Sequence, residues 1–510
     1  MIYSFSSFGY DGSLISVETD LRRGIPSVDI VGLADGSVKE CRERVISAYK
    51  NSALSFPSER VLISLSPADL KKEGAGFDLP LALSVYESLH KDELKDISVM
   101  AIGELELSGK VRMTRGIYQG LATAKENGIK IAIIPETPED LDPSLIPEGM
   151  KVYKADTLNK AVTALYKIGA EDEKNYFTEY KPKEEKKEIS FSADNEEKTS
   201  FDAFTIDDLK TPTQNAIKMA IATAISGRHH ILTYGSINQS MATTLLQFSY
   251  QITPDLLEGE KETVKRIYSL AGLDRKNPNV RPFRIPHQTA SIEGICGGGA
   301  NCRPGEISLA HNGILFLDEV MEFRSSVLQM LRVPLENKNI TLSRAGRTTV
   351  YPADFQLFMK ANSCPCGSYG SKDRVCLCSA KSIEQYWKKI SAPLLDRIEI
   401  IVNTDEIEEE EFTSKEELQN IIKRAWEIQI ERQGKLNSHL NTSEIAKYIT
   451  YDEDCKNYLL EMMMKNSFTQ RRLDHMIKVS QTIADMKGEK LNITHFKKAF
   501  SYCKHIPLEM

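Results

Sequence analysis

Short apolar runs with strand character alternate with amphipathic stretches along most of the chain. In residues 1–168, runs such as SVDIVGL, RVLISLS and KIAIIPE are separated by helical stretches at 36–52 and 118–128. Short apolar runs bounded by polar turns predict strands, and apolar positions at a helical spacing predict helices. Residues 1–168 therefore predict an N-terminal α+β or α/β domain.

The apolar pattern stops at residues 169–205, where EDEK, KPKEEKKE and DNEEK dominate. Such a segment cannot bury enough apolar surface to fold, so it predicts a flexible charged linker. From 206 to about 405, strands again alternate with helices, which favours a parallel sheet with crossover helices. Residues 406–510 are helical throughout and predict a small helical lid. The predicted fold class is α/β with these three domains.

Composition and charge narrow the function only slightly. The chain has 510 residues, of which 41% are apolar and 27% charged, as in globular proteins. A net charge of −7 argues against a protein that coats nucleic acid by bulk electrostatics, so any such contact must be local. No apolar stretch of about 18 residues is present. We therefore expect a cytoplasmic protein without a membrane partner.

Residues 313–319 read GILFLDE, an apolar strand that ends on Asp318 and Glu319. In P-loop ATPases the first carboxylate of such a pair holds magnesium through water, and the second polarises the attacking water. A solvated strand end is the alternative interpretation. The phosphate-binding loop expected upstream is broken. Its remaining positions are Gly235, Ser240 in place of the second Gly, Met241 in place of the Lys, and Ala242 in place of the magnesium-binding hydroxyl.

Loss of one charge-assisted bond costs roughly 1.5 to 3 kcal/mol, about ten- to a hundredfold in affinity. The broken loop therefore predicts weak nucleotide binding. Other residues fit an ATPase: Asn362 follows the apolar strand FQLFMKA and is placed to orient the same water. Arg397 suits an arginine finger for an adjacent subunit, and Arg471 opens a helix from which it could reach the γ-phosphate in cis.

Four of the nine cysteines lie within the zinc-loop candidate, residues 364–378. Two close thiol pairs can supply four tetrahedral sulfur ligands to zinc, and Cys364, Cys366, Cys376 and Cys378 are the candidate ligands. Reduced loop cysteines and a reversible disulfide are the alternatives.

The segment NITLSRAGRTTVYPADF reads as two strands around a turn, and it is locally basic at Lys338, Arg344 and Arg347. Basic hairpin tips contact phosphates without reading sequence, so this hairpin predicts salt-dependent, non-specific DNA binding. An ordinary solvated turn is the alternative. The Gly-rich segment 295–306 is a second candidate for a pore loop.

The strings VGLADGSVKECRERV, LSPADLKKEGAGFDLPLAL, RPFRIPHQTAS, GGGANCRPGEISLAHNGILFLDEVMEF, CPCGSYG and APLLDRIEI occur in order along the chain. Together they resemble the ComM (YifB) family of magnesium-chelatase-like AAA+ proteins from Met1 to the C-terminus. The resemblance implies a homo-oligomeric ring, with a hexamer as the candidate stoichiometry, and ATP and magnesium as cofactors. It also implies a DNA helicase that drives branch migration during natural transformation.

By this resemblance Asp318 and Glu319 are Walker B, Asn362 is sensor 1, Arg397 is the finger and Arg471 is sensor 2. Gln214 belongs to the adenine-site pair of the family, although Thr213 replaces its Gly. The N-terminal domain resembles the Lon protease domain. Gly76 stands where Lon carries its nucleophile, and no Lys lies between 110 and 125, so proteolysis is not expected.

Two function classes remain open. In one, the protein is an active ATP-dependent branch-migration helicase whose altered loop still binds ATP. In the other, it is a pseudo-ATPase that acts on branched or single-stranded DNA, and the joint loss of the Lys and the hydroxyl favours this one. A chelatase acting on a tetrapyrrole is a third possibility, which no residue pattern supports.

Overall fold

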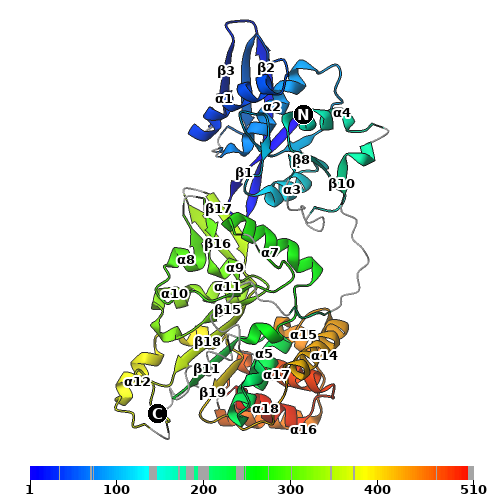
Figure 1. Ribbon diagram of the computed structural model, residues 1–510. Coiled ribbons are helices and arrows are strands. Elements are labelled where there is room, and N and C mark those ends of the chain that lie inside the picture. Colours follow the sequence, from blue (N-terminus) through cyan, green and yellow to red (C-terminus); the bar gives the residue numbers. More distant parts are fainter. Residues whose placement is uncertain are drawn as a thin grey trace.

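The computed structural model describes residues 1–33, 35–68, 70, 72, 74–136, 146–170, 173–179, 189–192, 206–236, 246, 248–273, 275–299, 301–344, 347–371, 374–466 and 468–503. The chain builds an N-terminal domain, a core with a parallel sheet, and a helical C-terminal region (Figure 1). No helix among these residues is long and apolar enough to cross a membrane.

The N-terminal domain is a mixed sheet with helices packed on it. Its strand order is β10-β9-β8-β5-β1-β2-β4-β3, with antiparallel pairing around β2 and parallel pairing from β1 to β9. The strands are β1 (Ile2–Phe8), β2 (Asp11–Arg22), β3 (Ser27–Val31), β4 (Arg60–Ser66), β5 (Val99–Ala101), β8 (Ile131–Pro135), β9 (Lys151–Ala155) and β10 (Phe177–Glu179), with the small pair β6 (Glu104–Leu105) and β7 (Val111–Arg112). The helices are α1 (Gly36–Asn51), α2 (Asp78–Leu89), α3 (Ile117–Glu126) and α4 (Leu158–Lys167).

The core contains a five-stranded sheet, order β12-β15-β18-β11-β19, and every pairing in it is parallel. Its strands are buried on both faces, which explains their nearly continuous apolar sequences. They are β11 (Ile231–Gly235), β12 (Phe283–Arg284), β15 (Ile314–Leu317), β18 (Gln356–Asn362) and β19 (Ile400–Asn403). The helices are α5 (Pro212–Gly227), α7 (Glu258–Ala271), α8 (Ile292–Cys296), α9 (Glu306–Leu309), α10 (Ser325–Met330), α11 (Arg332–Asn337), α12 (Ala380–Trp387) and α13 (Ala392–Leu395).

Two hairpins extend from the core toward the N-terminal domain. They are β13 (Gly297–Gly298) with β14 (Arg303–Pro304), from the Gly-rich segment, and β16 (Asn339–Arg344) with β17 (Arg347–Pro352). The lid has the helices α14 (Lys415–Gln433), α15 (Thr442–Tyr448), α16 (Glu453–Asn466), α17 (Gln470–Lys487) and α18 (Ile493–Tyr502). Trp426 and Gln429 of α14 donate hydrogen bonds to carbonyls at the end of α5, so the lid shares one apolar cluster with the core.

The turn between β1 and β2 docks the N-terminal domain on the core. The Gly9 N–H donates to the Asn301 carbonyl at 3.2 Å, and the Tyr10 N–H donates to the Thr349 hydroxyl of β17 at 2.8 Å. The Tyr10 ring lies under the Arg266 guanidinium at 4.1 Å and packs edge-on against Tyr351 at 5.6 Å. The N-terminal domain is therefore joined directly to strand β17 of the β16–β17 hairpin (Figure 1).

The predicted linker is ordered at both ends, which corrects the expectation of a flexible segment there. Phe177 lies in β10, which pairs with β9, and Glu173 accepts hydrogen bonds from Lys151 and Tyr153. At the other end, Ile189 is buried in the core and Ser190 bonds Asp255. These isolated apolar residues anchor a segment whose overall composition is polar. The parts at 180–188 and 193–205 lie outside the described residues.

Candidate functional site

The carboxyl ends of three adjacent strands bring the predicted catalytic residues to one edge of the parallel sheet. Gly235, the last residue of β11, lies opposite Asn362, the last residue of β18. Strand β15 pairs with the other side of β18 and ends at Leu317, so Asp318 and Glu319 emerge beside Asn362. In open α/β sheets, ligands bind at this edge. The structure thus brings together four residues from three segments that are far apart in the sequence.

Glu319 has an unusual backbone and a partner that the sequence did not reveal. Its φ of 50° and ψ of 54° lie in the left-handed region, which costs a non-glycine residue of order 1–3 kcal/mol and is typical of functional sites. Gln288, from the loop between β12 and α8, donates a 2.8 Å hydrogen bond to its carboxylate. The strained backbone and this bond together fix the direction of the Glu319 side chain.

A lysine on the central strand faces the same carboxylate edge. Lys360 of β18 is 3% exposed, and its Nζ lies 3.7 Å from Oδ1 of Asp318. At an effective dielectric constant of about 20, two unit charges at this separation attract by about 4 kcal/mol. Asn362, two residues further on the same face, has a buried side-chain oxygen without a partner among the described residues. Lys360 escaped the sequence analysis because it stands inside an apolar strand.

The first residues of the phosphate-loop region, Gly235 and Ser236, are in contact with other groups of the protein. The Ser236 N–H donates to the Asp405 carboxylate at 2.7 Å, just after β19. A Cβ on Gly235 would lie 1.9 Å from the Thr404 hydroxyl, so only glycine fits there. Ser240, Met241 and Ala242 lie outside the described residues.

Magnesium fits this edge poorly. In a working loop a hydroxyl and the first carboxylate of the DE pair hold the ion. Here the hydroxyl position is Ala242, and an ammonium already faces Asp318. A divalent cation at Asp318 would be repelled by Lys360. At this edge the positive charge therefore comes from a protein side chain, Lys360, and not from a metal ion.

Gln214, the predicted adenine-site residue, caps helix α5. Its side-chain oxygen accepts the Thr211 N–H at 2.8 Å, while the Thr211 hydroxyl accepts the Gln214 N–H at 3.3 Å. This capping box uses the acceptor of the Gln214 carboxamide, and only its N–H₂ group is left for a ligand.

Arg397 and Arg471 lie together at the opposite edge of the sheet. Arg397 precedes β19, whose first residue bonds the His230 carbonyl just before β11, so it is at the amino ends of these strands. Its guanidinium pairs with Glu336 and holds the pKa of that carboxyl below its ordinary value. Arg471, at the start of α17, contacts the same Glu336 at 3.4 Å and Asp396 at 3.7 Å. The expected cis contact of Arg471 is therefore wrong in this structure.

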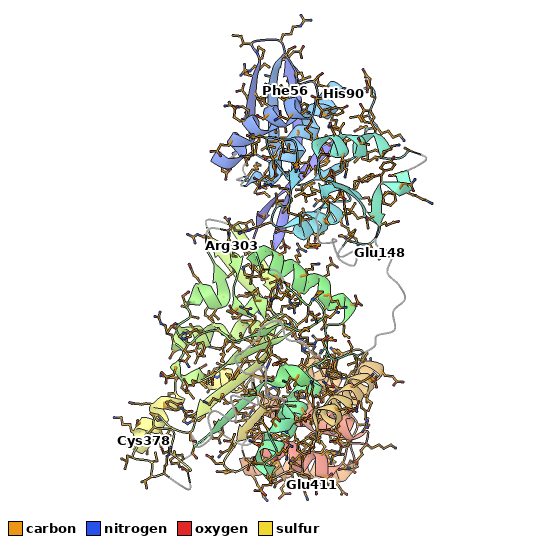
Figure 2. All side chains as sticks on the ribbon, viewed as in Figure 1. Phe56, His90, Glu148, Arg303, Cys378 and Glu411 are labelled. Atoms are coloured by element: carbon orange, nitrogen blue, oxygen red, sulfur yellow. The ribbon has the colours of Figure 1, made fainter. Side chains whose placement is uncertain are left out.

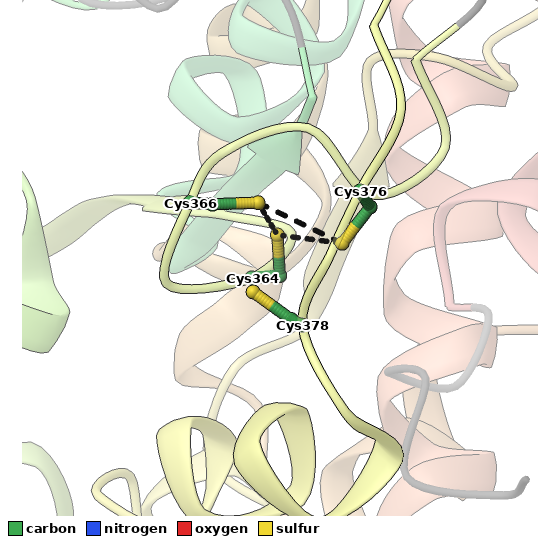
Figure 3. Close-up of side chains that lie close together, drawn as sticks. All are labelled: Cys364, Cys366, Cys376 and Cys378. Carbon is green, nitrogen blue, oxygen red and sulfur yellow. Dashed lines mark hydrogen bonds between the residues drawn. The ribbon is translucent and has the colours of Figure 1, made fainter.

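The four clustered cysteines converge after β18. The Sγ atoms of all four lie within 4.8 Å of one another, and those of Cys364, Cys366 and Cys376 are separated by 3.3, 3.6 and 3.6 Å (Figure 3). These separations exceed a disulfide bond and match the sulfur spacing of a tetrahedral metal site. The Ser368 N–H and the neighbouring thiols lower the pKa of Cys366 to about 6, which favours a thiolate. The cluster could hold a metal ion.

The basic hairpin is formed as predicted, but its three cations do not gather at one end. Arg344 ends β16 and lies opposite Arg347 in the register, so both backbones are next to the turn. Lys338 precedes β16, about 20 Å away at the strand rise, and its Nζ pairs with Asp354 at 3.3 Å. Lys338 therefore lies at the base of the hairpin, away from Arg344 and Arg347 at the turn, and its contact with DNA stays a prediction.

A cavity of about 590 Å³ separates the N-terminal domain from the core. Gly76 and Thr114 line it on one side, and Arg303 and Tyr351 line it on the other; Figure 2 shows Arg303 at this junction. Among the described residues that line the cavity there is no lysine. The described lining residues therefore offer no serine–lysine pair.

Comparisons with known proteins agree with this domain order. Family models match residues 17–138 (subunit ChlI of Mg-chelatase), 208–412 (magnesium chelatase, subunit ChlI) and 413–503 (magnesium chelatase, subunit ChlI C-terminal). The competence protein ComM of Haemophilus influenzae is 32% identical over 517 residues, which cover 98% of this chain and 97% of that protein. YifB of Salmonella typhimurium is 32% identical over 526 residues, with 98% and 96% covered. The Lon protease of Koribacter versatilis is 23% identical over 162 residues, covering 30% of this chain and 20% of that protease.

Proposed function

Because this chain belongs to the ComM and YifB family of magnesium-chelatase-like proteins, we propose that it is an AAA+ ring protein acting on branched or single-stranded DNA, with weak or absent ATP hydrolysis. The observation that carries the proposal is the altered nucleotide edge. Met241 and Ala242 remove the phosphate-binding ammonium and the magnesium-binding hydroxyl, and Lys360 faces the remaining carboxylate. The N-terminal domain resembles the Lon protease domain but lacks the catalytic residues of that domain. Its role is to position other parts of the ring.

The arginines support a homo-oligomeric ring. Arg397 and Arg471 share Glu336 at the edge opposite Asp318, so neither can serve the nucleotide of its own subunit. A finger acts by reaching the phosphates of a neighbour, which requires a second copy of the chain against this face. A hexamer remains the candidate stoichiometry.

The hairpin and its attachment support a DNA partner. Arg344 is exposed near the tip of β16–β17, and Thr349 and Tyr351 of β17 are held by Tyr10 of the N-terminal domain. A basic hairpin held along one strand in this way suits phosphate contacts inside a ring. The relative from Haemophilus influenzae is named a competence protein, which makes DNA uptake and recombination the proposed setting.

Replacing Arg344 and Arg347 with Ala should weaken binding to fluorescent forked or single-stranded DNA in the absence of ATP. Each lost phosphate contact reduces the slope of log K against log salt by roughly 0.7 for single strands. The check is fluorescence anisotropy across a salt series. The control Arg22→Ala with Arg23→Ala removes two exposed charges from the far end of β2 and should bind as the natural protein does. Equal binding by the hairpin variant, or no DNA binding at all, would contradict the proposal.

The alternative is an active branch-migration helicase. The retained pair Asp318 and Glu319, and the buried unpartnered oxygen of Asn362, favour it. An ATPase assay with forked DNA separates the two functions. Strong turnover that disappears in Glu319→Gln would end the pseudo-ATPase proposal and favour the helicase.

We also infer that the cysteine cluster holds zinc. Four sulfur donors with tetrahedral spacing suit this ion, since a Zn–S bond of about 2.3 Å places sulfurs about 3.8 Å apart. Cys364 is buried beside Trp387, whose indole N–H donates to the Ser363 carbonyl at 3.1 Å. A bound zinc ion would thus fix the end of β18, next to Asn362.

Purified protein is expected to carry about one equivalent of zinc per chain by elemental mass spectrometry. Cys366→Ser, which alters an exposed ligand, should lose most of this zinc and lower the melting temperature of the core. Cys296→Ala, at a buried cysteine outside the cluster, should keep the zinc. Metal-free natural protein, or an intact disulfide among the four thiols, would rule the zinc site out.

A further inference from the structure

The carboxylate of Asp354 lies between the base of the β16–β17 hairpin and the lid. Its Oδ2 is 3.3 Å from Nζ of Lys338, the residue that precedes β16. Its Oδ1 is 3.5 Å from Nε2 of His439, which belongs to the short helix η7 (Asn437–His439) between α14 and α15 of the lid. The hairpin and the lid, which are far apart in the sequence, therefore contact the same charged group.

The backbone of Asp354 is fixed to the core. Its N–H donates to Nδ1 of His311 at 3.0 Å, and its carbonyl accepts the Asn312 N–H at 2.7 Å. The guanidinium of Arg228, at the end of α5, donates to the same carbonyl at 3.1 Å. The carboxylate is thus a stationary point, and a movement of the lid or of the hairpin changes the contacts that each makes with it.

The carboxylate is ionised at neutral pH and stabilises the lysine beside it. Burial raises the pKa of Asp354, but the Arg228 guanidinium and the His439 hydrogen bond outweigh this effect and hold the pKa well below its usual range. Burial and the positive charges of Arg228 and Lys435 lower the pKa of Lys338, whereas Asp354 raises it. The ammonium of Lys338 therefore depends on Asp354 for its place among cations from α5 and the lid.

Loss of this negative charge would push the hairpin base away from the lid. Glu444 of the lid does not replace it, because both of its carboxylate oxygens accept from Lys435 at 2.7 Å. Without the charge of Asp354, Lys338 would face the like charges of Arg228 and Lys435. The distance between hairpin and lid is therefore set by one carboxylate.

The hairpin carries a change at its base to its tip. The Ala353 N–H donates to the Lys338 carbonyl at 2.8 Å and closes the base. From there β16 and β17 pair in register up to Arg344 opposite Arg347. Because cross-strand hydrogen bonds hold such a ribbon together along its length, a rotation at the base also rotates the basic tip.

We propose that Asp354 couples the lid to the DNA-binding hairpin, so that the lid sets the direction in which the basic tip points. Lys338 and His439 are the positioning residues on the two sides of this carboxylate. The proposal rests on the proposed function, since the hairpin must bind DNA for its direction to matter. Coupling is reciprocal, so DNA bound at the hairpin must also tighten the lid.

The first test is fluorescence anisotropy of forked DNA with the full-length protein across a salt series. Asp354→Asn, which keeps the size of the side chain, should weaken binding by about fivefold or more, as is typical of coupled sites. The slope of log K against log salt should stay unchanged, because no phosphate contact is removed. Lys338→Gln should behave in the same way. A smaller slope in Lys338→Gln would show that this lysine binds phosphate directly, and would overturn the proposal.

A double-mutant cycle tests the lid side. His439→Gln alone should weaken DNA binding by about threefold, and it should have no further effect in a chain that carries Asp354→Asn, because the shared group is already lost. Glu453→Gln is the control: it removes a lid carboxylate that pairs with Lys456 on α16, far from the hairpin, and should change nothing (Figure 1). An equal effect of His439→Gln in both chains would overturn the proposal.

Hydrogen exchange supplies a readout that a merely structural role of Asp354 would not change. Saturation with forked DNA should slow amide exchange in the lid segment 437–448, and this protection should be absent in Asp354→Asn. If Asp354→Asn does not fold, His439→Gln decides in the same experiment. Natural protein that binds DNA without protecting this segment would overturn the coupling alone. Natural protein that binds no DNA would remove the proposed function, and the coupling with it.

Discussion

A chain that carries Met241→Lys, Ala242→Thr and Lys360→Ala is expected to hydrolyse ATP at least about a hundredfold faster than the natural protein. The new lysine and hydroxyl restore two charge-assisted contacts, to the phosphates and to magnesium, each worth about ten- to a hundredfold. Removal of Lys360 opens Asp318 to the ion. The measurement is steady-state phosphate release in magnesium, with and without forked DNA.

Controls make this result specific. Glu319→Gln in the repaired chain should return turnover to background, because the group that polarises the attacking water is lost. Repair of the loop without Lys360→Ala should give a much smaller gain. Arg397→Ala in the repaired chain should also remove the gain, since a finger contributes about three to five decades where it operates. No gain in the fully repaired chain would show that another part of the edge, such as Asp405, prevents catalysis.

The sheet and its ligand edge could be predicted from the sequence because their signals are local. Apolar runs followed at once by Gly235, Asp318 or Asn362 define strand ends, and parallel strands place such ends together. The cysteine cluster was also accessible, since Cys364 and Cys378 belong to one short segment.

The residues that the sequence could not place depend on contacts between distant segments. Lys360 stands in a run that is otherwise apolar, and only the pairing of β18 with β15 shows the carboxylate beside it. Gln288 reaches Glu319 from another loop. Arg471 and Lys338 were assigned by sequence neighbourhood, whereas their positions follow from how α17 and the hairpin pack on the core.

The core should lose at least about 3 kcal/mol of stability when the pH falls from 7.5 to 5.5, because burial lowers the pKa of His311 and His475 and also those of His230 and His439. Burial lowers the pKa of His311 to about 4 and that of His475 to about 3. The Asp354 N–H also donates to Nδ1 of His311, which keeps that ring neutral. In the unfolded chain a histidine titrates near pH 6.5, so between that pH and the folded pKa the unfolded state binds more protons than the folded state. The contribution of these histidines to stability is therefore fully present above about pH 6.5. It decreases as the pH falls toward the folded pKa values.

The size follows from the linkage. At pH 5.5 each histidine that stays neutral in the folded state lowers the free energy of unfolding by about 1.4 kcal/mol. His311 and His475 together lower it by about 3 kcal/mol.

Glu399 and Asp354 do not contribute in this window. Burial raises the pKa of each carboxyl, but the Arg228 guanidinium and the His439 hydrogen bond outweigh it at Asp354. At Glu399, polar contacts from His230 and His229 outweigh it. Both pKa values lie well below their usual range, so their contribution is lost only below about pH 4.5.

Urea unfolding followed by tryptophan fluorescence checks this prediction, because both tryptophans, Trp387 and Trp426, lie in the core and its interface with the lid. His475→Gln should reduce the stability difference between pH 7.5 and 5.5 by about 1.4 kcal/mol, since one titrating group is gone. His90→Gln, in the N-terminal domain, should leave the difference unchanged. A midpoint that does not move between the two pH values would show that these rings accept protons inside the folded core. His475 belongs to the lid helix α17 and lies near Glu399, which precedes β19 of the sheet. The same titration therefore also measures how firmly the lid is attached to the sheet.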